Sequence, residues 1–252
     1  MRKSILTLSV AAALSVPGLV AAQAPAAAAA PASPHTITGN MGLFSEYRFR
    51  GLSQTFEKPA LQGGFDYAHS SGFYAGNWNS NVSETLFSGA SLEMDFYGGF
   101  KKSFGDFGID VGAIYYYYPG SNLAGVGKIE NTEIYLGGSW KWISAKYYHA
   151  VSDFFSAPDT KGSSYIDLAA TFDLGSGWGV VGHWGQQKVK NTSAADYSDW
   201  KLGVTKDLGN GWNATASYID TDAEPFWTAT NAGGKTLFLG DSTVVISIGK
   251  SF

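Results

Sequence analysis

Apolar and polar residues alternate with a period of two along most of the chain after residue 35. In the segment 36–50, one face carries Ile37, Gly39, Met41, Leu43, Ser45, Tyr47 and Phe49, and the other carries Thr36, Thr38, Asn40, Glu46, Arg48 and Arg50. Such alternation predicts a strand with one apolar face. It recurs to the C-terminus and predicts about twelve strands of roughly ten residues, the span that a tilted strand needs to cross a bilayer.

The connections between these expected strands alternate between short and long. Short ones fall near 70–72, 102–106, 141–142, 175–177 and 207–211, and long ones fall near 51–59, 83–89, 119–130, 152–162, 188–195 and 221–240. A soluble β-sandwich also alternates, but it has no reason for so regular an asymmetry. Because an open sheet edge is costly in lipid, the first and last strands must pair. We predict an all-β, antiparallel up-and-down transmembrane barrel with short periplasmic turns, longer extracellular loops and both termini in the periplasm.

Aromatic residues gather near the two ends of the expected strands. Beside the short turns we expect a periplasmic girdle of Phe100, Phe107, Trp140, Trp142, Phe172, Trp178, Trp212 and Phe252. The opposite belt would contain Tyr47, Phe49, Tyr115, Tyr117 and Tyr218. Aromatic rings settle at the lipid headgroup level, so two belts indicate two membrane interfaces.

The N-terminus predicts secretion. A short basic stretch precedes the apolar run 5–20, and small residues follow, so we expect a signal peptide over 1–22, with cleavage after Ala24 as the alternative. An Ala/Pro-rich linker over 23–35 would then precede a barrel over 36–252. The chain has no cysteine, so no disulfide framework holds it together. Its net charge of −4 and pI near 5.5 argue against nucleic acid as a partner.

The inner faces of the strands carry the residues that we expect to line the lumen. The charged ones are Glu46, Arg48, Arg50, Asp66, Glu93, Asp95, Asp110, Glu133, Lys146, Asp167, Asp199 and Lys201. We place uncharged hydrogen-bonding side chains there as well, namely Gln62, Asn77, Asn79, Asn81 and Gln187. The excess of acid favours cations in a water-filled pore. Twelve strands lie between a filled barrel and an open porin, so the alternative is that these charges pair and fill the interior.

Two functions follow. The first is passive diffusion of small hydrophilic or ionic solutes through a narrow, net-acidic outer-membrane channel, with the loop 221–240 as a candidate constriction. The second is a closed barrel that acts through its external loops, as a structural, adhesive or lipid-modifying protein. For catalysis, only His149, Ser152 and Asp153 form a group worth testing, and we expect no enzyme. We expect no cofactor, and no side chains have the spacing of a metal site.

Several stretches resemble a known family. They are Ser45-Glu-Tyr-Arg-Phe-Arg-Gly-Leu-Ser-Gln54, 59–67, 71–78, Tyr115-Tyr-Tyr-Tyr-Pro-Gly120 and 199–204. Across residues 36–252 the chain resembles the TorF family, proteobacterial porin-like proteins without an assigned substrate. The resemblance implies an outer-membrane barrel. The C-terminal Phe252 is similar to the signal that barrel-assembly machinery reads, and the other expected partners are outer-membrane lipid, lipopolysaccharide and small polar solutes.

Overall fold

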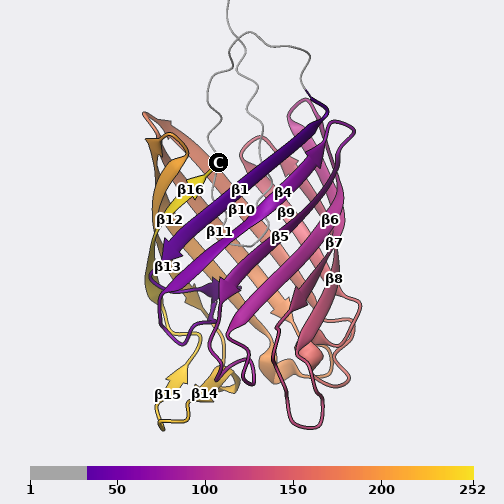
Figure 1. The fold of residues 1–252 in the computed structure, drawn as a ribbon, viewed down its shortest axis with the longest axis vertical. Coiled ribbons are helices and arrows are strands. Elements are labelled where there is room, and N and C mark those ends of the chain that lie inside the picture. The colour runs from indigo at the N-terminus through magenta and orange to yellow at the C-terminus, as the bar shows by residue number, and fades with distance from the viewer. Residues whose placement is uncertain (1–32) are drawn as a thin grey trace, which may run out of the picture.

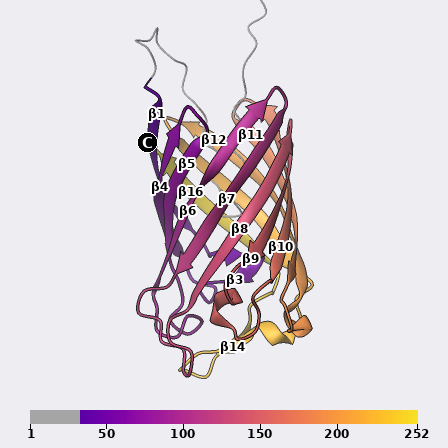
Figure 2. The ribbon, with the colours of Figure 1, turned by 90° about the vertical axis from the view of Figure 1, so that its right-hand side faces the viewer.

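The computed structural model describes residues 33–252, so the expected signal peptide and most of the linker lie outside the described residues. Twelve antiparallel strands form a closed barrel (Figures 1 and 2): β1 (His35–Phe44), β4 (Ala60–His69), β5 (Phe73–Asn81), β6 (Leu92–Phe104), β7 (Phe107–Tyr117), β8 (Glu130–Trp140), β9 (Ile143–Ala150), β10 (Ser164–Gly175), β11 (Trp178–Lys188), β12 (Tyr197–Gly209), β13 (Trp212–Thr221) and β16 (Thr243–Ser251). Each strand pairs with its neighbours in sequence. The predicted fold is confirmed.

Two small hairpins are separate from the sheet that forms the barrel wall. They are β2 (Arg48–Phe49) with β3 (Leu52–Ser53), and β14 (Thr228–Thr230) with β15 (Thr236–Phe238). Within residues 33–252 the helical segments are three single turns, and none is long or apolar enough to span a membrane: η1 (Phe154–Ser156), η2 (Ser193–Ala195) and η3 (Pro225–Trp227).

The two ends of the barrel differ in their connections. At one end the connections have two or three residues, and at the other they have eight to twenty-one. We call these the short-turn end and the long-loop end; they are at the top and bottom of Figure 1. The start of β1 and the C-terminal Phe252 both lie at the short-turn end, because Gly39 and Phe252 pair there.

The seam between β1 and β16 closes the barrel. Leu43 pairs with Ile248, and Asn40 with Ser251. Beyond the last strand, Gly39 and Phe252 exchange two backbone hydrogen bonds of 2.7 and 2.9 Å. The Phe252 ring lies over Gly39, where an added Cβ would come within 2.5 Å of it. The C-terminal residue is therefore part of the wall and not a frayed end.

The outer surface is apolar and the inner one is largely polar. Ile37, Leu136 and Leu168 are 74%, 64% and 44% exposed on the outside. The largest buried apolar cluster lies inside the barrel and contains eight tyrosines and phenylalanines from the wall and loops together with Trp78 and several aliphatic residues. An aromatic core inside the ring means that the barrel is not an empty tube.

The first strand is shorter than the alternation predicts. β1 ends at Phe44, and the chain then turns into the lumen. Tyr47 and Phe49, expected in the outer aromatic belt, lie inside instead, and Tyr47 is only 2% exposed. A hairpin crossing the lumen also alternates with period two, since it too has two faces. The pattern alone therefore could not distinguish it from a wall strand.

The faces of β5 are the reverse of the prediction. Asn77 pairs with the exposed Phe65 on one side and Phe96 on the other, so the column of Asn77, Asn79 and Asn81 faces outward. These amides bond to backbone groups of the adjacent strands; for example, Asn79 Nδ2 donates to Gly63 O at 3.2 Å. The inward face carries Tyr74 and Trp78, which pack and hydrogen-bond inside the barrel.

Candidate functional site: the lumen and its inner hairpin

A hairpin inside the lumen is the main feature of the interior. We call residues 48–53 the inner hairpin; β3 is labelled within the lower half of the barrel in Figure 2. Arg48 pairs with Ser53 and Phe49 with Leu52, which leaves Arg50 and Gly51 as a two-residue turn. Both have positive φ, 48° and 81°, as the favoured hairpin turns require. A Cβ on Gly51 would lie 2.4 Å from the Thr221 methyl group, so glycine is needed there.

Arg50, at the tip of the inner hairpin, is held by side chains of the barrel wall. Its guanidinium makes a two-pronged contact with Glu133, with Nη1 3.1 Å from Oε1 and Nη2 2.6 Å from Oε2. Nη1 also donates to Gln187 Oε1 at 2.7 Å. The rings of Tyr165 and Tyr148 lie 4.3 and 5.3 Å from the guanidinium carbon. Burial by itself lowers the pKa of Arg50, but the Glu133 carboxylate raises it, and the net pKa lies above the ordinary value of arginine.

The base of the inner hairpin is tied to the loop 222–242. Arg48 Nη1 donates to three backbone carbonyls, those of Gly51, Leu239 and Asp241, at 3.1, 2.8 and 2.9 Å. Its Nε forms an ion pair with Glu46 at 3.0 Å. The loop itself lies at the long-loop end, where Leu237 and Leu239 pack with Leu52 and Phe56. The segment that fills the lumen is therefore 45–59, not the loop 221–240.

Tyr47, just before the inner hairpin, contacts the wall at β5 and β6. Its hydroxyl donates to Glu93 Oε1 at 3.3 Å, and its ring meets Trp78 edge to face at 5.3 Å. Burial raises the pKa of the Tyr47 phenol well above its usual value, and the charges of Glu93 and Asp95 raise it further. Among the described residues, Glu93 Oε2 and Asp95 Oδ1 have no hydrogen-bond partner. Two carboxyl groups thus lie close together in the buried part of this wall.

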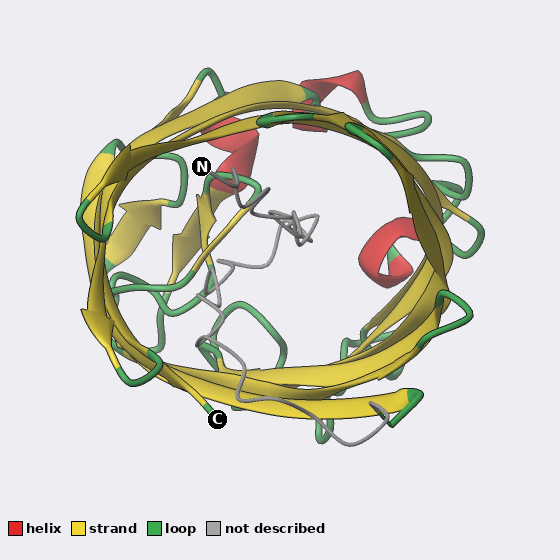
Figure 3. Ribbon diagram, turned by 90° about the horizontal axis from the view of Figure 1, so that it is seen from above, coloured by secondary structure: helices red, strands yellow, loops and turns green. Residues whose placement is uncertain are grey.

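The lumen is filled around the inner hairpin. Each of the twelve wall strands contributes an inward side chain there that is at most 9% exposed: Phe44, Gln62, Trp78, Asp95, Tyr116, Glu133, Tyr148, Tyr165, Gln187, Asp199, Ile219 and Val245. Figure 3, a view along the barrel, shows loop segments that cross the inside of the ring. These buried side chains and the inner hairpin narrow the lumen at this height.

Toward the short-turn end the interior becomes polar and then open. Lys146 Nζ lies 2.7 Å from Asp110 Oδ2, and the Tyr97 hydroxyl donates to Asp66 at 2.6 Å. His183 sits between two carboxylates, 3.1 Å from Asp167 and 2.8 Å from Asp199, with Lys201 opposite it in the register. Farther along, the inward Lys101, Ser103 and Thr171 are exposed. The interior is thus a vestibule open at the short-turn end.

The expected lumen charges all lie inside, but on two different structures. Glu46, Arg48 and Arg50 belong to the segment that crosses the lumen, whereas the sequence placed them on a wall strand. The nine others, from Asp66 to Lys201, lie on inward strand faces. The sequence reasoning overlooked the tyrosines that hold Arg50 and Glu93. The available signals were Arg50-Gly51, which suits a two-residue turn, and tyrosines in phase with the charged positions.

A family model described as a bacterial protein of unknown function, Gcw_chp, matches residues 28–252. The chain belongs to this family. A search of curated proteins found no match. Among solved structures, the KdgM porin aligns with a TM-score of 0.54 at 7% identity, over 85% of this chain and 99% of that one. KdgM porin in complex with disordered oligogalacturonate gives 0.53 at 8%, over 86% and 98%, and NanC porin gives 0.51 at 10%, over 86% and 99%.

These similarities show that this Gcw_chp member has the barrel fold of the porins. At such low identity they show the fold alone. The resemblance to the TorF family stays a prediction.

The residues expected in the periplasmic girdle lie on the outside at the short-turn end. Phe107, Trp140, Trp142, Phe172, Trp178, Trp212 and Phe252 are 40–64% exposed, and Phe100 is half-buried against Phe73. Several rings have an ammonium group beside them: Lys206 Nζ lies 4.9 Å from Trp178, and Lys250 Nζ lies 5.5 Å from Trp212. Such pairs suit an interface where an apolar layer meets charged headgroups.

The group considered for catalysis does not come together. His149 faces outward and stacks on Tyr147, whereas Ser152 accepts a hydrogen bond from Thr132 N, and Asp153 accepts from Thr160 N and Lys161 N. Among residues 33–252, no three acidic, histidine or cysteine side chains are grouped to hold a metal ion.

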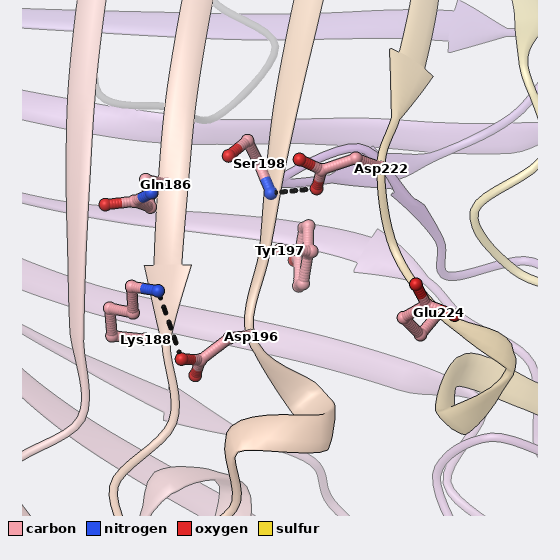
Figure 4. A pocket seen from close by; sticks show the side chains of 7 residues that line it. All are labelled: Gln186, Lys188, Asp196, Tyr197, Ser198, Asp222 and Glu224. Atoms are coloured by element: carbon pink, nitrogen blue, oxygen red, sulfur yellow. Dashed lines mark hydrogen bonds and ion pairs between the residues drawn. The ribbon is translucent and has the colours of Figure 1, made fainter.

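A shallow hollow of about 210 Å³ lies at the long-loop end (Figure 4). Lys188 and Asp196 form an ion pair of 3.1 Å across it, and Asp222 accepts a hydrogen bond from Ser198 N. These two contacts hold the polar groups on the walls of the hollow in place.

Proposed function

We propose that this protein is an outer-membrane channel for small cations and small uncharged polar solutes, and that the inner hairpin closes it in the conformation described. The observation that carries the proposal is a porin-type barrel whose polar vestibule is open at one end and is filled farther in by the inner hairpin and the side chains around it. Passive diffusion then requires the withdrawal of the inner hairpin from the lumen.

The charge of the lumen supports this choice of solutes. The expected pore-lining set contains eight acidic and four basic residues. The KdgM porin has been crystallised with oligogalacturonate, a carboxylate-bearing chain. An excess of acid repels such a ligand and attracts cations, so we propose that this channel differs from KdgM in the sign of the solute it prefers.

The proposed orientation follows from the surface. The apolar outer wall and the aromatic rings with lysines at the short-turn end suit the periplasmic interface of the outer membrane. Both termini would then be periplasmic, and the long loops would face lipopolysaccharide. Phe252, as part of the seam, would be the residue offered to the barrel-assembly machinery.

A second function, a closed barrel acting through its loops, is favoured by the filled lumen. Planar-bilayer recordings separate the two. We expect the intact protein to open rarely, and a variant with residues 48–53 replaced by two glycines to give steady, cation-selective steps. Correct folding is checked by the lower gel mobility of the barrel after heating. A folded hairpin-less barrel that stays silent at all voltages would contradict the channel and favour the closed barrel.

Selectivity provides a finer test in the conducting variant. Asp66 lies in the vestibule and accepts a hydrogen bond from the Tyr97 hydroxyl. Asp66→Asn should shift the reversal potential in a salt gradient toward zero, whereas Asp159→Asn in the exposed loop 151–163 should leave it unchanged. Equal shifts from both substitutions would contradict an acidic lumen as the source of selectivity.

A further inference from the structure

The side chains around Arg50 form a cage that belongs to the barrel wall. Glu133 comes from β8, Tyr148 from β9, Tyr165 from β10 and Gln187 from β11, four consecutive strands. Tyr148 pairs with Tyr165, and Tyr165 with Gln187, so three of them form one row across the inner surface. We call these four residues the cation cage.

Contacts within the wall hold most of the cation cage in place. Gln187 Nε2 donates to the backbone oxygens of Ser164 and Lys188, at 3.1 and 3.2 Å, and so turns its carbonyl toward the lumen. The Tyr165 hydroxyl donates to Asp199 Oδ2 at 2.8 Å, and the Tyr116 hydroxyl donates to Glu133 Oε2 at 3.3 Å. None of these bonds involves the inner hairpin. The cage is therefore preorganised when Arg50 leaves it.

The cation cage matches the chemistry of a guanidinium group. A carboxylate accepts the two-pronged contact, an amide oxygen accepts a third N–H, and two aromatic faces cover the plane. A planar guanidinium uses all of these groups at once, whereas a compact ammonium cannot make the forked contact. The neutral molecule urea has the same shape but lacks the charge.

Arg50 reaches this cage from a hairpin that is not part of the barrel sheet. Its partners are wall side chains, whereas Arg48, at the base of the hairpin, bonds to backbone carbonyls of the hairpin and the loop 222–242. The tip therefore can leave its cage while the base stays attached.

We propose that the cation cage is a binding site for small solutes that bear a guanidinium group, and that Arg50 is a built-in occupant which such a solute displaces. This inference rests on the proposed channel, because the solute must enter the lumen. It names the solute class that the channel prefers and the contact that keeps it closed.

Binding is tested on the purified barrel without any conductance measurement. Arg50→Ala empties the cage, so its thermal midpoint should fall below that of the natural sequence. Guanidinium chloride at 1–20 mM, about the range of a weak ion-binding site, should raise this midpoint saturably, with total salt held constant with sodium chloride. Ligands that bind only the folded state stabilise it in this way. Urea and methylammonium chloride at equal concentrations should give a much smaller shift.

Two controls make the result specific. The natural sequence should show a much smaller shift, because Arg50 competes with guanidinium for the same cage. Arg50→Ala combined with Glu133→Gln should lose the response, because the carboxylate is gone. If Arg50→Ala does not fold, Arg50→Gln serves, since it keeps a polar stem. Equal shifts with guanidinium and urea, or a shift that survives Glu133→Gln, would overturn the cage.

Channel recordings then test displacement. Guanidinium chloride should raise the open probability of the natural protein in a concentration-dependent manner, and sodium at the same ionic strength should not. If the hairpin-less barrel conducts but neither assay detects guanidinium, the cage inference is wrong and the channel stands. If guanidinium stabilises Arg50→Ala but no variant conducts, the cage stands and the channel is wrong.

Discussion

A double-mutant cycle should give a far larger coupling energy for the ion pair between Arg50 and Glu133 than for a surface pair. The variants are Arg50→Met, Glu133→Gln and the two combined. Neither side chain is exposed, and their closest atoms are 2.6 Å apart. At this distance and an effective dielectric constant of about 20, Coulomb attraction is roughly 6 kcal/mol. Desolvation of both charges offsets most of it, so the net value of the intact pair is small.

Removing one partner is different, because it leaves the other charge buried and unpaired. Each single substitution should therefore lower the free energy of unfolding by about 3–5 kcal/mol. The combined variant leaves no buried charge at the tip, so its loss should be well below the sum of the two. We expect a coupling energy of about 2 kcal/mol or more between Arg50 and Glu133.

The assay is urea unfolding in detergent micelles, followed by tryptophan fluorescence and by the gel mobility of the folded barrel. The chain supplies its own control, the pair of Lys235 and Glu57, at 3.5 Å with side chains 59% and 39% exposed. A cycle on that pair should give less than about 1 kcal/mol. Equal coupling in the two cycles would show that the hairpin tip is not buried in the wall as described.

Three further results are expected. Burial and the charges of Glu93 and Asp95 raise the pKa of Tyr47 above its unfolded value of about 10. The contribution of the neutral phenol to stability is therefore present below that pH and is lost as pH rises. Tyr47→Phe should reduce the fall in the free energy of unfolding between pH 9 and about 11, measured by urea unfolding. Gly51→Val places a side chain at φ 81° against Thr221, so it should destabilise the inner hairpin by about 1–3 kcal/mol and raise the open-channel time in bilayer recordings. The control is Gly125→Val, which also has positive φ but lies in an open loop, and it should leave the open-channel time unchanged. Gly39→Val should push the Phe252 ring away from the seam and lower the yield of folded, heat-modifiable barrel during refolding into vesicles. Gly182→Val is the control, because Gly182 has open space around it. Equal yields from the two variants would argue against a role of the Phe252 ring in closure.

The barrel itself was predictable because a membrane wall imposes one rule on every strand. Lipid requires an apolar outer face, and closure requires paired edges, so alternation, turn lengths and strand number all lead to the same fold. The inward positions of Asp110, Glu133 and Asp167 followed from the same rule, because their outward neighbours are apolar. Where a side chain is compatible with only one face of the barrel wall, the period of two in the sequence is sufficient to predict which face it occupies.

The predictions failed where a polar or charged residue can find a hydrogen-bond partner or an opposite charge in a second way. On β5 the amides of Asn77 and Asn79 face outward because backbone oxygens of β4 and β6 accept their hydrogens, a contact that alternation cannot reveal. The inner hairpin was missed because Arg48 and Arg50 alternate with Tyr47 and Phe49 as they would in a wall strand. Their partners, Glu133 and Leu239, are 83 and 191 residues away along the chain. No local pattern contains that information.

The placement of the basic residues links closure to selectivity. Of the twelve charges expected in the lumen, Glu46, Arg48 and Arg50 belong to the segment that crosses it, and nine belong to the wall. In the closed conformation there are eight acids and four bases; when Arg50 leaves with the tip of the inner hairpin, eight acids and three bases stay in place. The positive charge of Arg50, which neutralises Glu133 in the closed conformation, thus leaves with the tip of the inner hairpin. Opening therefore creates a more acidic inner surface of the barrel, which attracts cations. A lysine or arginine fixed on the wall would neutralise the same carboxylate but would keep the open pore less selective. In the proposed channel, the contact between Arg50 and Glu133 therefore has two effects. While it is intact it keeps the inner hairpin in the lumen, and once it is broken the free Glu133 carboxylate makes the open path more acidic.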